Sequence, residues 1–191
     1  LLRHQFDDVE NKILELYEKY PTNEQVRFSY AFLQFNLDNV SIAKKMFNDL
    51  VEEFPESWFV LAQMAYDSGD IDEAIAILER QTKNSTLREK ALHKLATVHF
   101  SQQQFEESLL VINVLLQKSR LDTQAILMKA KNLIALQKTK EAKHQLNILK
   151  GMWNEDASNL FILSRLFQKV SDFNSAEEIL AMAYALEPKA L

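Results

Sequence analysis

The stretch that decides the fold is WFVLAQMAYDSGDIDEAIAIL, residues 58–78. Its first half carries apolar residues three and four positions apart, and its second half repeats that spacing, as two amphipathic helices would. Between the halves Gly69 and Asp70 interrupt the pattern, and Asp70 followed by Glu73 is a typical pair for the start of a helix. The stretch therefore predicts two helices joined by a tight turn.

The small residue near the start of the second helix, Ala74, recurs along the chain at a nearly constant interval. Its counterparts are separated by 34, 31, 34, 34 and 34 residues, and the series is Val9, Ala43, Ala74, Ser108, Ala142 and Ala176. Small residues also recur in the first helices, at Ala62, Ala96, Ala130 and Ser164. Small side chains let two helices approach closely, so the spacing predicts a stack of similar helix pairs.

Residues 58–78 resemble the tetratricopeptide repeat, a 34-residue helix–turn–helix with the pattern W-x2-L-G-x2-Y, then A-x3-F, then P. The matching residues are Trp58, Leu61, Ala62, Ala65, Gly69, Asp70 and Ala74, with Ala62 and Ala65 standing where the family has Gly and Tyr. The resemblance implies an all-α fold, a right-handed superhelical solenoid of antiparallel helix pairs. We expect about five complete repeats plus an N-terminal half repeat.

We expect one solenoid domain over residues 1–191. Its units lie near 5–20 (the half repeat), 22–54, 55–86, 87–120, 122–153 and 156–188. Helices are predicted near 5–20, 22–37, 40–54, 56–68, 71–83, 87–102, 105–118, 122–136, 139–151, 156–170 and 173–187. Capping boxes are predicted at Thr22 with Gln25 and at Thr86 with Glu89. The absence of an initial methionine and of a polar helix after Pro188 suggests a fragment of a longer chain, whose uncapped ends favour self-association.

The composition excludes several classes of protein. With 2 Gly and 3 Pro, the chain contains no Gly-rich phosphate loop, and with no Cys it has no disulfide or thiolate site. A net charge of -5 argues against a general affinity for nucleic acid or anionic membranes. No stretch is long and apolar enough for direct membrane insertion. The composition is compatible with both the cytoplasm and the bacterial periplasm.

The titratable residues do not form a recognisable reaction centre. His93 and His99 are six residues apart on one expected helix and face different directions, so they cannot share a metal ion. Carboxylate pairs such as Glu106–Glu107 stand at helix starts, where the helix dipole favours them. No nucleophile elbow is present. We therefore expect no catalytic activity, no cofactor and no metal site.

The resemblance implies that a ligand lies in the concave groove lined by the first helices. When the family's groove-lining positions are transferred to this sequence one by one, the candidate partner-binding residues are Phe28, Phe32, Phe59, Gln63, Tyr66, Lys90, Lys94, Lys131, Arg165 and Lys169. The N-terminal part of this set is aromatic and the C-terminal part is basic, which favours a peptide or partner helix that is apolar at one end and acidic at the other. The alternative is that the aromatic residues are core and the lysines are ordinary solvated charges.

A chaperone-tail adaptor is disfavoured. Family members of that kind use Lys, Asn, Asn, Lys and Arg on three successive first helices. Lys90 and Lys94 match the last two positions, but Phe28, Phe32 and Val60 stand at the others.

The sequence therefore predicts a non-catalytic scaffold for protein–protein interaction. One alternative is a regulatory or substrate-recruiting domain of a larger enzyme or cell-envelope assembly protein. Another, an RNA-binding helical repeat, is disfavoured by the acidic net charge and the aliphatic groove positions.

Overall fold

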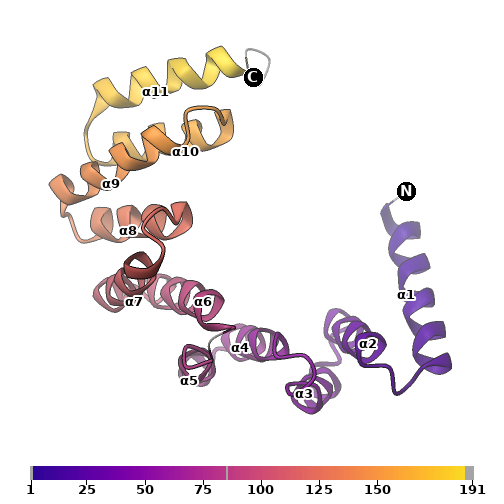
Figure 1. Ribbon diagram of the computed structural model, residues 1–191. Helices are drawn as coiled ribbons and strands as arrows, with labels where there is room; N and C mark the ends of the chain where they lie inside the picture. The colour runs from indigo at the N-terminus through magenta and orange to yellow at the C-terminus, as the bar shows by residue number, and fades with distance from the viewer. Residues whose placement is uncertain (1, 85, 188–191) are drawn as a thin grey trace. The chain divides into compact units, whose positions relative to one another are not determined.

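The computed structural model describes residues 2–84 and 86–187, with side chains from residue 8 onward. These residues form eleven α-helices and no strand (Figure 1). The helices are α1 (Leu2–Lys19), α2 (Glu24–Asn36), α3 (Val40–Asp49), α4 (Ser57–Asp67), α5 (Ile71–Gln81), α6 (Arg88–Ser101), α7 (Phe105–Lys118), α8 (Thr123–Ala135), α9 (Thr139–Met152), α10 (Ala157–Lys169) and α11 (Phe173–Leu186). Among the described residues, none of these helices has the length and apolar character needed to cross a membrane.

The chain divides into two compact units, unit 1 (Leu1–Ala91) and unit 2 (Leu92–Leu191). Within unit 1, α2 packs on α3 and α4 on α5; within unit 2, α8 packs on α9 and α10 on α11. The predicted all-α fold of helix pairs is confirmed, and each of the eleven predicted helices is present. The single-domain organisation stays a prediction, and Pro188, the predicted end of the last unit, lies outside the described residues.

The recurring small residues lie where helices meet. Their exposed fractions are between 0% and 3% at Ala43, Ala74, Ser108, Ala142 and Ala176. The two serines among the recurring small residues form hydrogen bonds to the other helix of their pair. Ser108 Oγ donates to the carbonyl of Ala96 at 2.9 Å, and Ser164 Oγ donates to the carbonyl of Ala176 at 2.8 Å. Close approach of the two backbones, as the spacing predicts, is therefore the reason that bulky side chains are absent from these positions.

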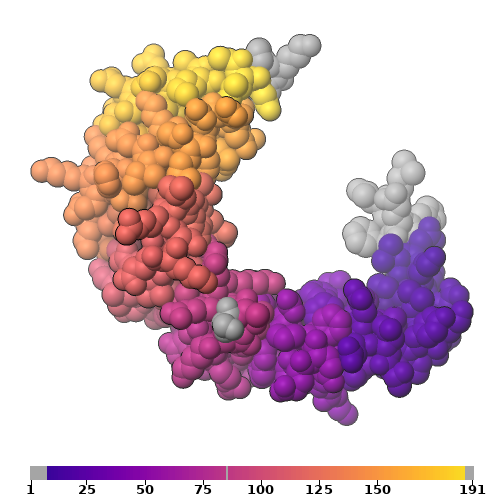
Figure 2. Space-filling model, viewed as in Figure 1, coloured from indigo at the N-terminus to yellow at the C-terminus, as the bar shows by residue number. Residues whose placement is uncertain are grey.

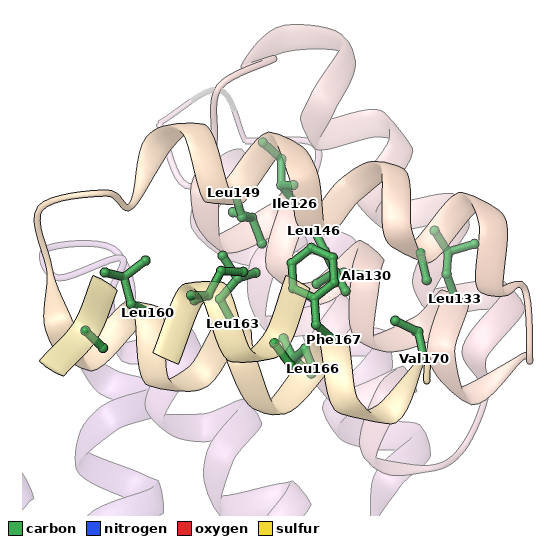
Figure 3. Packing of buried hydrophobic residues seen from close by; sticks show 14 residues of the cluster. Ile126, Ala130, Leu133, Leu146, Leu149, Leu160, Leu163, Leu166, Phe167 and Val170 are labelled. Carbon is green, nitrogen blue, oxygen red and sulfur yellow. The ribbon is translucent and has the colours of Figure 1, made fainter. Parts of the chain in front are cut away.

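The larger core cluster of unit 2 is drawn from α8, α9, α10 and α11, and a smaller one joins α6, α7 and the start of α8. Phe167 is fully buried and lies near the centre of the larger cluster, beside Leu146 and Ala130 (Figure 3). The side chains of α8 to α11, coral red to yellow in Figure 2, pack closely against one another. Each pair therefore buries its apolar face against its neighbour, as stacked repeats do.

The turns inside the repeats follow the same interval as the small residues. Positive φ angles of 57–85° occur only once per repeat among the described residues, at Asp38, Gly69, Gln103, Gln137 and Ser171. At each turn the amide of this residue and the amide of the next one donate back to carbonyls of the preceding helix, for example Gly69 to Tyr66 and Asp70 to Ala65. This left-handed closure ends the first helix and lets the second begin at once.

These turns predict opposite effects for two substitutions. Gly69→Ala places a Cβ at φ 85° with no atom within 4 Å, so only backbone strain opposes it, and we expect a loss of about 1 kcal/mol in unfolding free energy. Gln137→Gly relieves the same strain at φ 57° and should gain up to about 1 kcal/mol. Denaturant unfolding of both variants measures the two changes, and shifts of the same sign would contradict this explanation.

Three local predictions need correction. Asn23, rather than Thr22, caps α2 by accepting from the Val26 amide at 3.0 Å. Thr86 donates its amide and its hydroxyl to Asn84 Oδ1 instead of forming a capping box. The third predicted helix ends at Asp49 rather than near residue 54, and turns follow it up to the proline at position 55. The predicted Asp70 cap is confirmed, with Oδ1 3.1 Å from the Glu73 amide.

Candidate functional site

The first two candidate residues, Phe28 and Phe32, belong to an aromatic cluster in unit 1. The ring of Phe28 stacks on Phe54 with centroids 5.2 Å apart, and both Phe28 and Phe32 meet the ring of Phe47 edge-on. Phe47 comes from α3 and is fully buried. Phe28 is half-buried and Phe32 is 37% exposed. Phe28 is therefore largely a core residue, whereas Phe32 also presents part of its ring to solvent.

The remaining candidates in unit 1 lie on α4 and at the start of α6. Phe59 is only 4% exposed, and Lys90 Nζ lies over its ring at 4.7 Å from the centroid. A partner would therefore meet the lysine before the ring. Gln63 donates to Asp67 Oδ1 at 2.8 Å on the surface of α4, and Tyr66 is half-buried.

The basic candidates of unit 2 form what we call the basic face: Lys94 on α6, Lys131 on α8, and Arg165 and Lys169 on α10. Lys131 and Arg165 are 34 residues apart and occupy equivalent positions of successive first helices. Arg165 and Lys169, one turn apart, share one side of α10. Within the part of the chain that the structure describes, Lys131, Arg165 and Lys169 have no hydrogen bond or ion pair.

Two lysines on the second helix α9 behave differently, because they pair with carboxylates of the next repeat. Lys143 Nζ on α9 lies 3.1 Å from Asp172 Oδ2, and Lys150 Nζ lies 2.7 Å from Glu178 Oε2. Lys143 and the Ser175 amide hold the pKa of the Asp172 carboxyl below its ordinary value. These pairs connect neighbouring repeats, so their charges are already partly compensated.

The helical charges of unit 2 are sorted by helix type. All helical carboxylates in unit 2 lie on second helices, at Glu106, Glu107, Glu141, Glu177 and Glu178. The helices α8 and α10 contain no Asp or Glu, and neither does the part of α6 that belongs to unit 2. The first helices of unit 2 are therefore positively charged although the chain as a whole has a net charge of -5.

Apolar side chains accompany the basic ones on these helices. Leu127 and Phe161 are partly buried against the core cluster, and Ile162 is 41% exposed. Ile162 lies three residues before Arg165, and Leu127 lies four residues before Lys131, so each pair lies on one side of its helix. A ligand at the basic face would meet cations and aliphatic or aromatic surface together.

Sequence reasoning missed which charges are paired. The ion pairs between described residues join positions 28 or 29 apart, for example Lys44 with Glu73. The hydrogen bond between His93 Nε2 and Asp122 Oδ2, 2.7 Å long, also joins positions 29 apart. Residues separated in this way lie opposite each other on neighbouring repeats. A search of the sequence for oppositely charged residues at this separation could have found the pairs. For Lys131 the corresponding positions hold Asn159 and Leu160, which is why that lysine stays unpaired.

Residues 25–57 and 55–85 each match a family model described as a tetratricopeptide repeat. Residues 25–85 are therefore tetratricopeptide repeats. Proteins of this family generally act as non-catalytic scaffolds that bind protein or peptide partners. No curated protein sequence matches the chain significantly.

Solved structures share the tetratricopeptide fold over most of the chain. YrrB, described as a tetratricopeptide-repeat protein with an unusual peptide-binding site, is 14% identical with a TM-score of 0.59, covering 93% of both chains. MamA from Desulfovibrio magneticus RS-1 is 13% identical with a TM-score of 0.67, covering 87% of this chain and 96% of its own. A tetratricopeptide-repeat protein from Parabacteroides merdae is 12% identical with a TM-score of 0.69, covering 92% and 71%. At these identities the likeness establishes the fold alone.

Proposed function

We propose that this tetratricopeptide-repeat protein is a non-catalytic scaffold whose basic face binds an acidic, partly apolar segment of a partner protein. The observation that carries the proposal is the sorting of charge in unit 2. Carboxylates are absent from the first helices of that unit, while three of their basic side chains have no partner among the described residues. Unpaired cations on a rigid helical surface attract acidic groups and select against basic ones.

The apolar neighbours support a ligand of mixed character. Ile162 is exposed beside Arg165, and Leu127 lies beside Lys131. A purely acidic ligand would leave this apolar surface uncovered, whereas a segment with both acidic and aliphatic side chains covers it. YrrB, which shares the fold, is described as having a peptide-binding site, and this agrees with a peptide-like ligand. The aromatic candidates of unit 1 stay a prediction.

The test is the affinity of a synthetic peptide of alternating glutamate and leucine for two variants that carry the same change in net charge. Lys131→Glu with Arg165→Glu reverses the basic face. Lys118→Glu with Lys140→Glu changes exposed lysines on α7 and α9 that are without ion pairs in the described structure. We expect the first double variant to lose about 100-fold in affinity, roughly tenfold per reversed charge, and the second to lose less than about threefold.

Fluorescence anisotropy measures both affinities, and far-UV circular dichroism verifies that both variants keep their helices. Equal losses for the two double variants would show that net charge, and not the basic face, attracts the peptide. That result would refute the proposed binding surface.

A further inference from the structure

The side of α7 that faces away from the core carries exposed apolar side chains. Ile112 and Leu115 belong to the smaller core cluster of unit 2, with exposed fractions of 0% and 2%. Leu110 comes two residues before Ile112, which places it on the opposite side of the helix, and it is 69% exposed. Val114, one turn after Leu110, is 38% exposed. We call the side of α7 that carries Leu110 and Val114 the outer side of α7.

The fold does not require a large apolar residue at position 110. The equivalent positions of α5, α9 and α11 hold Ala76, His144 and Glu178, which are small or polar and exposed. Leu110 adds nothing to the packing of its own repeat, because most of its side chain faces solvent. Adjacent exposed apolar side chains with no role in the fold indicate a surface that contacts another protein.

Charges of opposite sign stand at the two ends of the outer side of α7. Glu106 and Glu107 lie in the first turn of α7, and Lys118 is its last residue. The helix dipole favours this order in any helix, so the order alone does not indicate a partner. None of the three residues, however, forms an ion pair with a described residue.

The neighbouring repeat does not compensate these charges. The separation of 28 or 29 residues that joins the ion pairs leads from the two glutamates and from Lys118 to uncharged residues, namely Ile134, Ala135, Leu136, Leu146 and Asn147. Asp122, one turn after Lys118, is already engaged, because Oδ1 accepts from the Ala125 amide and Oδ2 lies 2.7 Å from His93 Nε2. Within the described residues, both ends of α7 therefore lack a counter-charge.

An antiparallel second copy of α7 complements both the apolar and the charged residues. When two copies pair antiparallel about a two-fold axis, Leu110 of one copy meets Val114 of the other. In this register the first turn of one helix lies beside the last turn of its partner, so Glu106 meets Lys118. A parallel pair would oppose like charges, which is destabilising. We propose that the outer side of α7 is the interface of a dimer of this chain, in which the two α7 helices pack antiparallel.

The length of α7 sets the expected strength of this dimer. With 14 residues the helix is about 21 Å long. An interface built mainly on one pair of such helices is small, so we expect a reversible dimer with a dissociation constant on the order of 10 µM. The dimer does not depend on the basic face, whose cations lie on first helices.

The apolar contact is tested by sedimentation velocity at protein concentrations between about 1 and 200 µM. Leu110→Glu should raise the dissociation constant at least about tenfold, because it places a carboxylate in the apolar contact of both copies. Leu186→Glu on α11, where the leucine is 46% exposed, is the matched control and should leave the constant unchanged. Circular dichroism verifies that each variant keeps its helices.

Charge exchange tests the antiparallel register. Glu106→Lys with Glu107→Lys makes both ends of the outer side positive, and Lys118→Glu makes both ends negative. Either variant should weaken the dimer about tenfold, since each repulsion occurs twice in a two-fold pair. When all three changes are combined in one chain, opposite charges meet again, and the dissociation constant should return to within about threefold of the original. A parallel pair would not be restored in this way.

A chain that stays monomeric at about 200 µM would overturn the proposal, and so would equal effects of Leu110→Glu and Leu186→Glu. Failure of the combined variant to dimerise while it keeps its helices would overturn the antiparallel pairing. Lys131→Glu with Arg165→Glu should leave the dimer unchanged, and Leu110→Glu should leave binding of the glutamate–leucine peptide unchanged. Failure of the dimer is therefore distinguishable from failure of the basic face.

Discussion

Ala74→Asp is expected to unfold the repeat formed by α4 and α5, with a loss of about 3–5 kcal/mol in unfolding free energy. Ala74 has an exposed fraction of 0% and lies on α5, which packs on α4. A carboxylate there would be buried between the two helices, away from water and without a cation beside it. Denaturant unfolding followed by circular dichroism measures the loss.

The matched control for this prediction is Ala76→Asp. Ala76 lies two residues further along α5 and is exposed, so the same chemical change should alter the unfolding free energy by less than about 0.5 kcal/mol. Similar stabilities for the two variants would mean that the 34-residue interval does not mark the helix contacts. The assignment of every repeat would then be wrong.

Phe47→Ala is expected to cost about 3–5 kcal/mol, the usual range for removing a buried phenylalanine. The ring of Phe47 is fully buried and meets Phe28 at 5.5 Å and Phe32 at 5.3 Å between centroids. Its removal leaves a cavity that the neighbouring rings cannot fill without losing contact with each other. Thermal and denaturant unfolding measure the cost, and the loss should be largest in unit 1.

Phe173→Ala on α11 serves as the control, because Phe173 is 66% exposed and its truncation should change stability by no more than about 0.5 kcal/mol. A small effect of Phe47→Ala would show that the aromatic cluster is not part of the core.

The fold was predictable from the sequence because the same requirement, a small residue where two helices touch, recurs in each repeat. A larger side chain at a buried position such as Ala142 would push the two helices apart, so the 34-residue spacing of small residues is visible in the sequence. The turns were harder to predict. Among the described residues with positive φ, one is a glycine, Gly69, and the others are Asp, Gln or Ser, which do not mark a turn as clearly. Caps were least predictable, since Asn23 and Thr22 are adjacent and both residue types can cap a helix.

The candidate site was predictable in part. The basic character of Lys131, Arg165 and Lys169 follows from the sequence and the expected helix faces. Whether a lysine is paired depends on the residue opposite it in the next repeat, as the Lys143–Asp172 pair shows, and helical periodicity within one repeat does not give this. The burial of Phe59 under Lys90 likewise depends on contacts between helices that are distant in sequence.

We propose that the basic face recognises acidic, partly apolar segments. The most direct test of this proposal is selection of binders from a random peptide library displayed against the chain, followed by counter-selection on the two double variants. We expect the selected peptides to be enriched in Asp and Glu together with Leu, Ile or Phe. They should be lost on Lys131→Glu with Arg165→Glu and retained on Lys118→Glu with Lys140→Glu. Selection of basic or uncharged peptides, or equal loss on both double variants, would contradict it.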